Sequence, residues 1–314
     1  MTSPCTAFDR ASLYAKSRLF IRRALDAKSS RDFSSFHLWC SLALELLGKA
    51  ALSQVSPALV ADPTYRESLF AACGRTVGTD FKSITAKTVF ERMPLLTKRF
   101  DAYTTKFCEQ MALRRNSELH SGEAPLSDIR LDAWEPKFWH AAEVILSAQS
   151  ESLEEWLGAD AADAPKALLA HARQAIQSAV ASRIELHRTE FLAKHKSKRQ
   201  QDAARANRDA LTSEGLSKWR KFGLAHIAAT TCPACGAVAG LACELWSEEV
   251  TDFYDPTSPY LEEVERTYLP EWLYCGCCGL EFFSRSELEA ANLDTEIVER
   301  EARERVDEPE YGND

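Results

Sequence analysis

The arrangement of cysteines is the feature that most restricts how this 314-residue chain can fold. The pattern Cys-x-x-Cys-Gly occurs twice, at residues 232–236 and 275–279. Two cysteines at this spacing lie on one tight turn that directs both sulfur atoms at a single ion, and a second such turn completes a tetrahedral set of ligands. The predicted ligands of one structural Zn2+ per chain are Cys232, Cys235, Cys275 and Cys278.

Other interpretations of these thiols remain open. The four cysteines can also form two unrelated reduced thiol pairs, or one pair can be a redox motif. A redox motif needs only one such pair, which favours the metal site. Cys277 can replace a neighbouring ligand, but Cys275 and Cys278 match the first pair better. Cys243 is expected to be a buried or partly exposed free thiol. Four thiolates leave no open coordination position, so the predicted zinc is structural rather than catalytic.

The sequence around the second cysteine pair is typical of a short β-hairpin. Tyr274 precedes the pair, and Leu280 and Phe282 alternate after it, as in a zinc ribbon. The gap between the two pairs is longer than zinc ribbons usually have. We therefore expect a zinc ribbon over residues 223–290, with acidic residues 246–270 as an insertion loop, and an acidic tail over residues 291–314.

The N-terminal half has the periodicity of helices. In residues 35–54 apolar side chains recur at spacings of three and four. Further helices are expected at residues 9–27, 65–73, 95–120 and 135–157, and together they form a bundle over residues 1–158 that is large enough to bury its own core. With only 12 glycines and 12 prolines in the chain, helices are favoured over turn-rich β structure. The predicted class is mainly α: a helical bundle, a helical connector and a small β zinc ribbon on the C-terminal side.

The formal net charge of −9 conceals two oppositely charged regions. The basic helical connector, residues 159–222, has most of its Lys and Arg in residues 166–210, where ten stand against four acidic residues, whereas residues 241–314 contain five Arg and 21 acidic residues. The densest basic stretch, His187-Arg188 together with residues 194–199, either guides RNA or is simply a solvated helix face. The acidic C-terminal part disfavours a DNA-reading zinc ribbon and suits contact with an activating or inhibiting protein.

The sequence predicts no membrane association. No stretch approaches the roughly 18 apolar residues of a transmembrane helix, and residues 1–23 lack the apolar segment of a secretory signal. We therefore expect a cytoplasmic protein whose cysteines are reduced or bound to metal.

A second set of reactive side chains lies near the end of the helix expected over residues 95–120. Asn116 and His120 are four residues apart and share a helical face, and the long side chain of Arg115 can reach the same place. The helix dipole favours the imidazolium form of a histidine at the C-terminus. A cation, an amide and an imidazole can bind a phosphodiester and transfer protons on it. The spacing alone also fits a solvated arginine, a surface asparagine and a capping histidine.

The Arg-Asn-x-x-x-His element on a late helix of an N-terminal bundle resembles the HEPN superfamily of ribonucleases and nucleotide-binding domains. Arg115, Asn116 and His120 match the family signature position by position. Residues 42–50 resemble the Glu-containing helix of the family. They contain Glu45 and, one helical turn after it, Lys49. The resemblance covers residues 1–158.

This resemblance implies a metal-independent endoribonuclease that cleaves RNA, such as tRNA or mRNA, by attack of the ribose 2′-OH on the adjacent phosphate. His120 would act as general acid or base, Arg115 would hold the phosphate, and Asn116 would orient either of them. Glu45 would support Arg115 or form a structural ion pair with Lys49. The family pattern also implies a homodimer and, by analogy, a toxin-like effector of bacterial anti-phage defence.

An alternative from another functional class is a non-catalytic module. In that interpretation the HEPN-type bundle binds RNA or a nucleotide, or only dimerises, and the zinc ribbon recruits a protein partner. The presence of Arg115, Asn116 and His120 together favours the enzyme.

Overall fold

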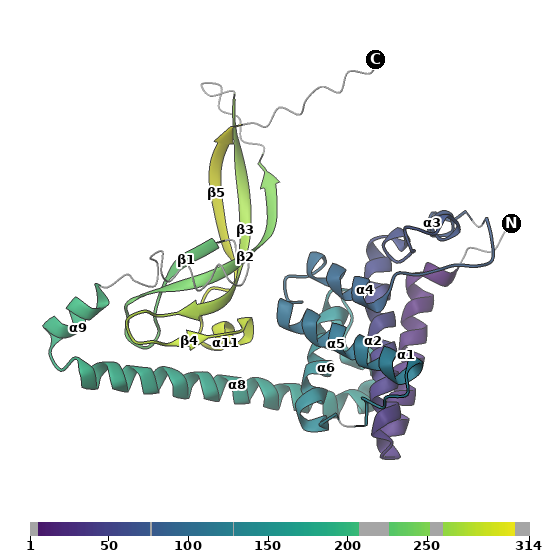
Figure 1. The fold of residues 1–314 in the computed structure, drawn as a ribbon, viewed down its shortest axis with the longest axis horizontal. Helices are drawn as coiled ribbons and strands as arrows, with labels where there is room; N and C mark the ends of the chain where they lie inside the picture. Colours follow the sequence, from purple (N-terminus) through teal and green to yellow (C-terminus); the bar gives the residue numbers. More distant parts are fainter. Residues whose placement is uncertain (1–5, 76, 128, 207–225, 252–259, 305–314) are drawn as a thin grey trace. The chain divides into compact units, whose positions relative to one another are not determined.

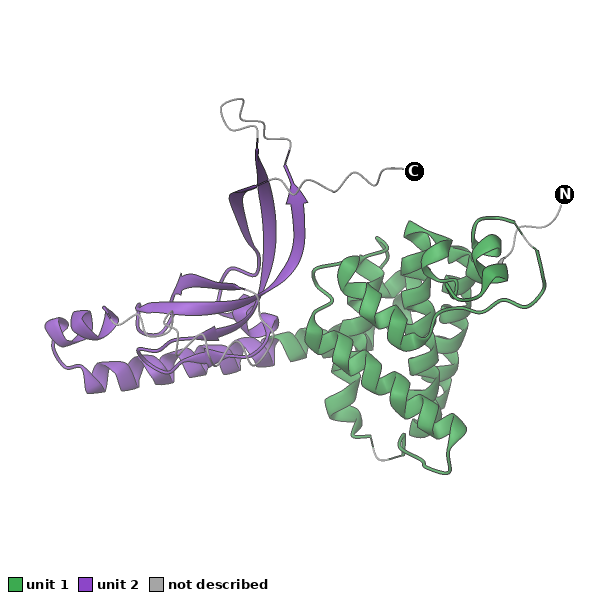
Figure 2. Cartoon of the chain, turned by 45° about the horizontal axis from the view of Figure 1, so that its top comes forward, with its two compact units in different colours: residues 1–173 green, residues 174–314 purple. Residues whose placement is uncertain are grey.

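The computed structural model describes residues 6–75, 77–127, 129–206, 226–251 and 260–304. The chain divides into two compact units, Met1–Arg173 and Gln174–Asp314 (Figure 2). Of the described residues, 58% are helical and 17% lie in strands. The prediction of a mainly α chain with a small zinc ribbon is therefore wrong, because the C-terminal unit contains a curled five-stranded antiparallel sheet. Within the described ranges, no helix is long and apolar enough to cross a membrane.

Unit 1 is a bundle of helices (Figure 1). Its α-helices are α1 (Arg10–Ser29), α2 (Phe33–Val55), α3 (Arg66–Ala72), α4 (Ala86–Arg92), α5 (Ala102–His120), α6 (Leu131–Ser147) and α7 (Leu153–Leu157). Short 3-10 turns at Thr6–Phe8, Pro57–Leu59 and Met93–Leu95 complete the unit. The helices predicted at residues 9–27, 35–54 and 65–73 are confirmed to within a few residues.

Helix capping explains where the other two predicted helices differ. The helix expected from residue 95 begins only at Ala102, because the Asp101 side chain accepts a hydrogen bond from the backbone N–H of Thr104. The helix expected over 135–157 is divided into α6 and α7. Ser150 has a positive φ of 59°, and Ser152 forms a capping box with Glu155 that starts α7.

The core of unit 1 surrounds α2, whose buried residues lie on most sides of the helix. The largest fully buried side chains of the unit include Trp139, Trp156, Phe36 and Phe138. Helices α2 and α4 approach closely at Gly48, where an added Cβ would lie 2.6 Å from a methyl carbon of Val89. This close approach brings the segment before α4 beside the polar residues of α2.

Unit 2 combines helix and sheet. Helix α8 (Ala159–Lys194) begins in unit 1, and its residues from 174 onward belong to unit 2. The other elements are α9 (Lys198–Arg205), β1 (His226–Thr231), β2 (Val238–Val250), β3 (Leu261–Tyr274), β4 (Glu281–Phe282), α11 (Arg285–Ala290) and β5 (Ile297–Glu304). The strands are antiparallel in the order β1-β2-β3-β4, and β5 pairs with β3. Val180 and Phe191 of α8 share a buried cluster with sheet residues such as Leu241 and Leu273.

Two acidic segments were expected to be irregular and instead form strands. In residues 246–270, expected as an insertion loop, β2 and β3 stay paired as far as Val250 and Val264. Residues 297–304 of the expected tail form β5. Their charges are compensated across the strands: Arg266 contacts Glu248 and Glu301, and Arg303 contacts Glu248 and Glu262. Residues 252–259 and 305–314 lie outside the described residues, as do residues 207–222 of the predicted connector.

Candidate metal centre and the Glu45–Arg115 network

The four predicted zinc ligands converge in unit 2. The sulfur atoms of Cys232, Cys235, Cys275 and Cys278 all lie within 4.8 Å of one another. Two of the sulfur–sulfur distances, Cys232 to Cys278 and Cys235 to Cys275, are 3.6 Å. A tetrahedral ion with metal–sulfur bonds of about 2.3 Å places its ligands about 3.8 Å apart. The four cysteines therefore lie close enough together to hold one metal ion.

The two cysteine turns have the same backbone geometry. In the first turn, the N–H of Cys232 donates to Ala237 and the N–H of Gly236 donates to Cys232; in the second, Cys275 and Gly279 make the equivalent bonds. Gly236 and Gly279 both have φ of 75°, in the left-handed region that favours glycine. Hydrogen bonding with Cys232 lowers the pKa of Cys235 and Cys275, whereas hydrogen bonding with Cys235 raises the pKa of Cys232 and hydrogen bonding with Cys232 raises that of Cys278. Metal binding requires the thiolate form of all four cysteines.

The two remaining cysteines of this region lie outside the group. Cys277, the alternative ligand, is not among the converging sulfur atoms, and burial raises the pKa of its thiol. Cys243 is fully buried in β2, and burial raises the pKa of its thiol to about 12. Both thus behave as protonated thiols, as the sequence predicted for Cys243.

Side chains of α8 and α9 contact the backbone of both cysteine turns. Arg205 donates to the carbonyl oxygen of Cys235 at 2.7 Å, and Arg188 donates to that of Pro233 at 2.9 Å. Nδ1 of His187 lies 2.8 Å from the carbonyl oxygen of Cys278. These groups fix the turns and place positive charge beside a set of four thiolates. Sequence reasoning assigned them only to a general basic connector.

The cations of the connector therefore divide into two groups. Those with partners inside the protein are Lys166, Arg173, Arg183, Arg188 and Arg205. Among the described residues, four exposed cations have no ion-pair partner: Lys194, Lys196, Lys198 and Arg199. The uncompensated charge is concentrated where α8 ends and α9 begins.

In unit 1 the structure joins Glu45 of α2 to Arg115 of α5. One carboxylate oxygen of Glu45 forms an ion pair with Arg115, and the other accepts a hydrogen bond from Nζ of Lys49 at 2.6 Å. Lys49 also donates to Oγ of Ser83 at 3.0 Å. The two interpretations of Glu45 are thus not exclusive, because the carboxylate supports Arg115 and pairs with Lys49 at the same time.

The side chains of this network are largely buried, and the Glu45 carboxylate remains ionised between its two cations. The side chains of Lys49, Arg115 and Glu45 are 8%, 10% and 15% exposed. Burial by itself raises the pKa of the Glu45 carboxyl group, but the charges and hydrogen bonds of Lys49 and Arg115 outweigh it, so the pKa lies below its ordinary value. Glu45 is ionised at neutral pH and holds two cations.

Asn116 extends this network to the surface. Nε and one terminal nitrogen of Arg115 both donate to Oδ1 of Asn116, at 3.1 and 2.9 Å. The amide N–H groups of Asn116 point away from these bonds, and the residue is exposed. His120 is the last residue of α5 and is also exposed, one helical turn from Asn116. The structure therefore brings Arg115, Asn116 and Glu45 into contact and leaves His120 at the adjacent helix end.

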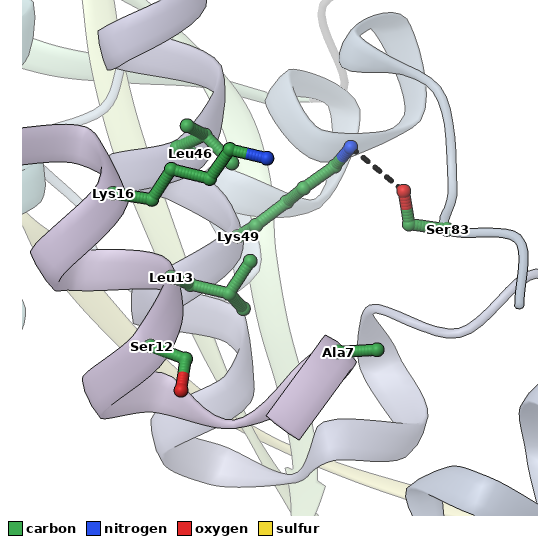
Figure 3. A pocket seen from close by; sticks show the side chains of 7 residues that line it. All are labelled: Ala7, Ser12, Leu13, Lys16, Leu46, Lys49 and Ser83. Carbon is green, nitrogen blue, oxygen red and sulfur yellow. Dashed lines mark hydrogen bonds between the residues drawn. The ribbon is translucent and has the colours of Figure 1, made fainter. Parts of the chain in front are cut away.

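A cavity of about 280 Å³ adjoins this network (Figure 3). Its wall includes Lys49 and Ser83, and also Lys16 of α1. Sequence reasoning missed Ser83, because it lies 34 residues from Lys49 in a segment without regular structure. A β-bridge between Ala61 and Ser83, with the backbone hydrogen bond from Ile84 to Val60, places its hydroxyl group here.

No protein-family model, curated protein or solved structure matches the chain.

Proposed function

We propose that the chain is an RNA-cleaving protein whose reactive groups are Arg115, Asn116 and His120, with a structural zinc ion in unit 2. The observation that carries the proposal is the Arg115 guanidinium, fixed by Glu45 and by exposed Asn116, with exposed His120 one helical turn beyond Asn116 on α5. Arginine contributes five N–H donors, and three of them are used by Glu45 and Asn116. Two N–H groups remain for a phosphate.

The proposed reaction assigns one role to each side chain. Arg115 holds the phosphate and stabilises the charge that develops on its oxygens. His120 takes the proton from the ribose 2′-OH, or donates one to the leaving 5′ oxygen, as general base or acid. Asn116 holds Arg115 through its carbonyl oxygen and offers its amide N–H groups to the substrate. The bond formed joins the 2′ oxygen to phosphorus, the bond broken is that to the 5′ oxygen, and the products are a 2′,3′-cyclic phosphate and a 5′-hydroxyl.

Zinc is the proposed metal because four thiolates in a tetrahedral arrangement are the usual donor set of structural zinc. The ligand set leaves no position for a substrate, so the ion would stabilise unit 2 and not take part in cleavage. Contact with RNA is proposed for Lys194, Lys196, Lys198 and Arg199, whose charges are not compensated in the described part of the chain.

The test is RNA cleavage by the purified protein in excess chelator, with wild type, Arg115→Ala and His120→Ala. Total RNA and tRNA serve as substrates, and a 2′,3′-cyclic phosphate is sought on the products. We expect cleavage by wild type and a loss of at least about 100-fold in both variants. His171→Ala is the matched control, because it removes a histidine from α8 and should leave cleavage unchanged. Equal cleavage by all four proteins would refute the assignment.

A binding module remains the second candidate, since Arg115 is buried and part of a structural ion-pair network. In that case the wild type binds RNA without cleaving it. Arg115→Ala then lowers the stability of the protein, and no cleavage activity is present in either protein. Expression of each variant in cells separates the candidates further. The toxin-like role in defence that we propose requires toxicity of wild type and none of His120→Ala.

A further inference from the structure

The cavity beside Lys49 is formed by α1, α2 and two adjoining segments of unit 1. Its lining residues are Ala7, Ser12, Leu13, Lys16, Leu46, Lys49 and Ser83 (Figure 3). None of the three side chains proposed for RNA cleavage belongs to this set. The cavity is therefore a separate feature that needs its own explanation.

The cavity is positively charged. Among its described lining residues, the charged groups are Lys16 and Lys49. The two side chains extend from neighbouring helices in the same direction, so both ammonium groups lie toward one end of the cavity (Figure 3). Lys16 is exposed, and within the described residues no ion pair neutralises it. An anion at this end would meet two cations and no carboxylate of the lining.

Lys49 retains hydrogen-bonding capacity. An ammonium group has three donors, and Lys49 uses one for Glu45 and one for Ser83. The Ser83 hydroxyl accepts from Lys49, so its own hydrogen can be donated to a ligand. Lys49 is only 6% exposed, and a charge with so little water around it interacts more strongly with an anion than a surface lysine does.

The remaining wall is apolar and comes from Ala7, Leu13 and Leu46. With about 280 Å³, the cavity has more room than an inorganic phosphate needs. A fitting ligand thus combines a doubly charged head with a small apolar body. We propose that this cavity binds a small organic phosphomonoester, with its phosphate on Lys16, Lys49 and Ser83 and its organic group against Leu13 and Leu46.

Glu45 gives the proposal a distinctive consequence. Its carboxylate contacts Lys49 and is the nearest negative charge that Lys49 has in the network. Neutralising Glu45 should therefore strengthen binding of an anion, whereas neutralising Lys16 should weaken it. The experiment measures only binding of the ligand, so its result does not depend on whether the protein cleaves RNA.

The experiment is a calorimetric titration of the full chain, loaded with metal, with phenyl phosphate, inorganic phosphate and phenol. We expect phenyl phosphate to bind more tightly than inorganic phosphate, and phenol not to bind. Lys16→Gln should weaken phenyl phosphate binding about fivefold or more, and Glu45→Gln should strengthen it about threefold. Lys106→Gln is the matched control, because it removes the same charge from an exposed position on α5 and should leave the affinity unchanged.

Several results would overturn the proposal. These are no heat of binding with phenyl phosphate up to about 20 mM, equal binding of phenol, or equal effects of Lys16→Gln and Lys106→Gln. Thermal unfolding followed by circular dichroism shows whether Glu45→Gln is folded. If it is not, the comparison of the two lysine variants decides, since both positions are exposed and tolerate substitution.

Discussion

In unit 1 the Glu45–Arg115 network lies beside a core built by other residues, whereas in unit 2 the four cysteines are part of the core itself. Trp139, Trp156 and Phe36 are fully buried in unit 1 without any polar ligand set. In unit 2, Cys232, Cys235 and Cys275 belong to the same buried cluster as Leu241 and Phe282. We therefore expect loss of the cysteine cluster to disturb the core of unit 2 more than loss of the Glu45 network disturbs the core of unit 1.

The two clusters also differ in how charge is compensated. The Glu45 network consists of one carboxylate between two cations, all from α2 and α5. The four cysteines of unit 2 can hold a metal ion, whose charge would add to that of Arg188 and Arg205, which donate to the carbonyl oxygens of Pro233 and Cys235. The charges of the Glu45 network are balanced within the chain, whereas the cysteine cluster can also take up an ion from outside it.

The largest effect that this comparison predicts follows from loss of the metal. Cys275→Ser, or chelation of the wild type, should remove most of the stability of unit 2, because structural zinc sites contribute on the order of 10 kcal/mol. The transition of unit 1 should be unchanged. Metal analysis measures the loss of the ion, and limited proteolysis compares the resistance of the two units to cleavage. Cys277→Ser is the matched control and should retain the metal, and simultaneous unfolding of both units would contradict the comparison.

A smaller but still large effect is expected for Glu45→Ala. The substitution leaves Arg115 and Lys49 buried without their carboxylate, which costs about 3–5 kcal/mol. Chemical denaturation of the full chain should show the loss in the unit 1 transition alone, with the metal content unchanged. Glu91→Ala removes a carboxylate from an exposed pair with Lys87 and should cost less than about 1 kcal/mol. Equal costs for both variants would show that the network has no special role.

A third prediction concerns the cationic contacts of the metal centre. Arg205→Ala removes the hydrogen bond to the carbonyl oxygen of Cys235 and should lower metal affinity about tenfold. Competition with a chromophoric chelator measures the affinity. Arg199→Ala, one turn and a half earlier on α9 and without an ion pair in the described structure, should bind metal as the wild type does. If both variants lose metal affinity equally, the affinity depends on the net charge of α9 and not on the hydrogen bond from Arg205 to Cys235.

The smallest effect is a pH dependence of unit 1. The pKa of Glu45 is lower in the folded protein than its ordinary value of 4.5. Its contribution to stability is therefore complete above pH 4.5 and is lost as the pH falls through the lowered pKa of the folded state. Denaturant unfolding at several acidic pH values should show a steeper loss for the wild type than for Glu45→Gln. Parallel curves for the two proteins would refute the assignment of this titration to Glu45.

Local patterns in the sequence were sufficient for several parts of the structure. The spacing of three and four in α2 predicted its length to within two residues at each end. The capping box at Ser152 and Glu155 was also present in the sequence, as Ser-x-x-Glu, and would have predicted the break between α6 and α7. Signals of this kind are readable because they depend on neighbours within one turn of helix.

The acidic strands show where such patterns are insufficient. Both β2 and β3 extend into segments rich in Glu, because arginines on β3 and β5 lie opposite those carboxylates. The matching residues are separated by 18 to 55 positions. In the distal part of β2 and in β5, residues on both faces of the strand are largely exposed, so these segments lack the apolar alternation of a half-buried strand and the sheet was underestimated.

The sequence by itself identified the four cysteines that converge and the position of Asn116 and His120 on one helical face. Cysteine turns and helical faces are set within a few residues, so these features need no knowledge of the fold. Only the tertiary structure decided that Glu45 joins Arg115 across 70 positions, that Ser83 meets Lys49, and that Arg205 contacts the turn of Cys235. These contacts depend on which elements pack together, and that is fixed by the burial of the cores as a whole.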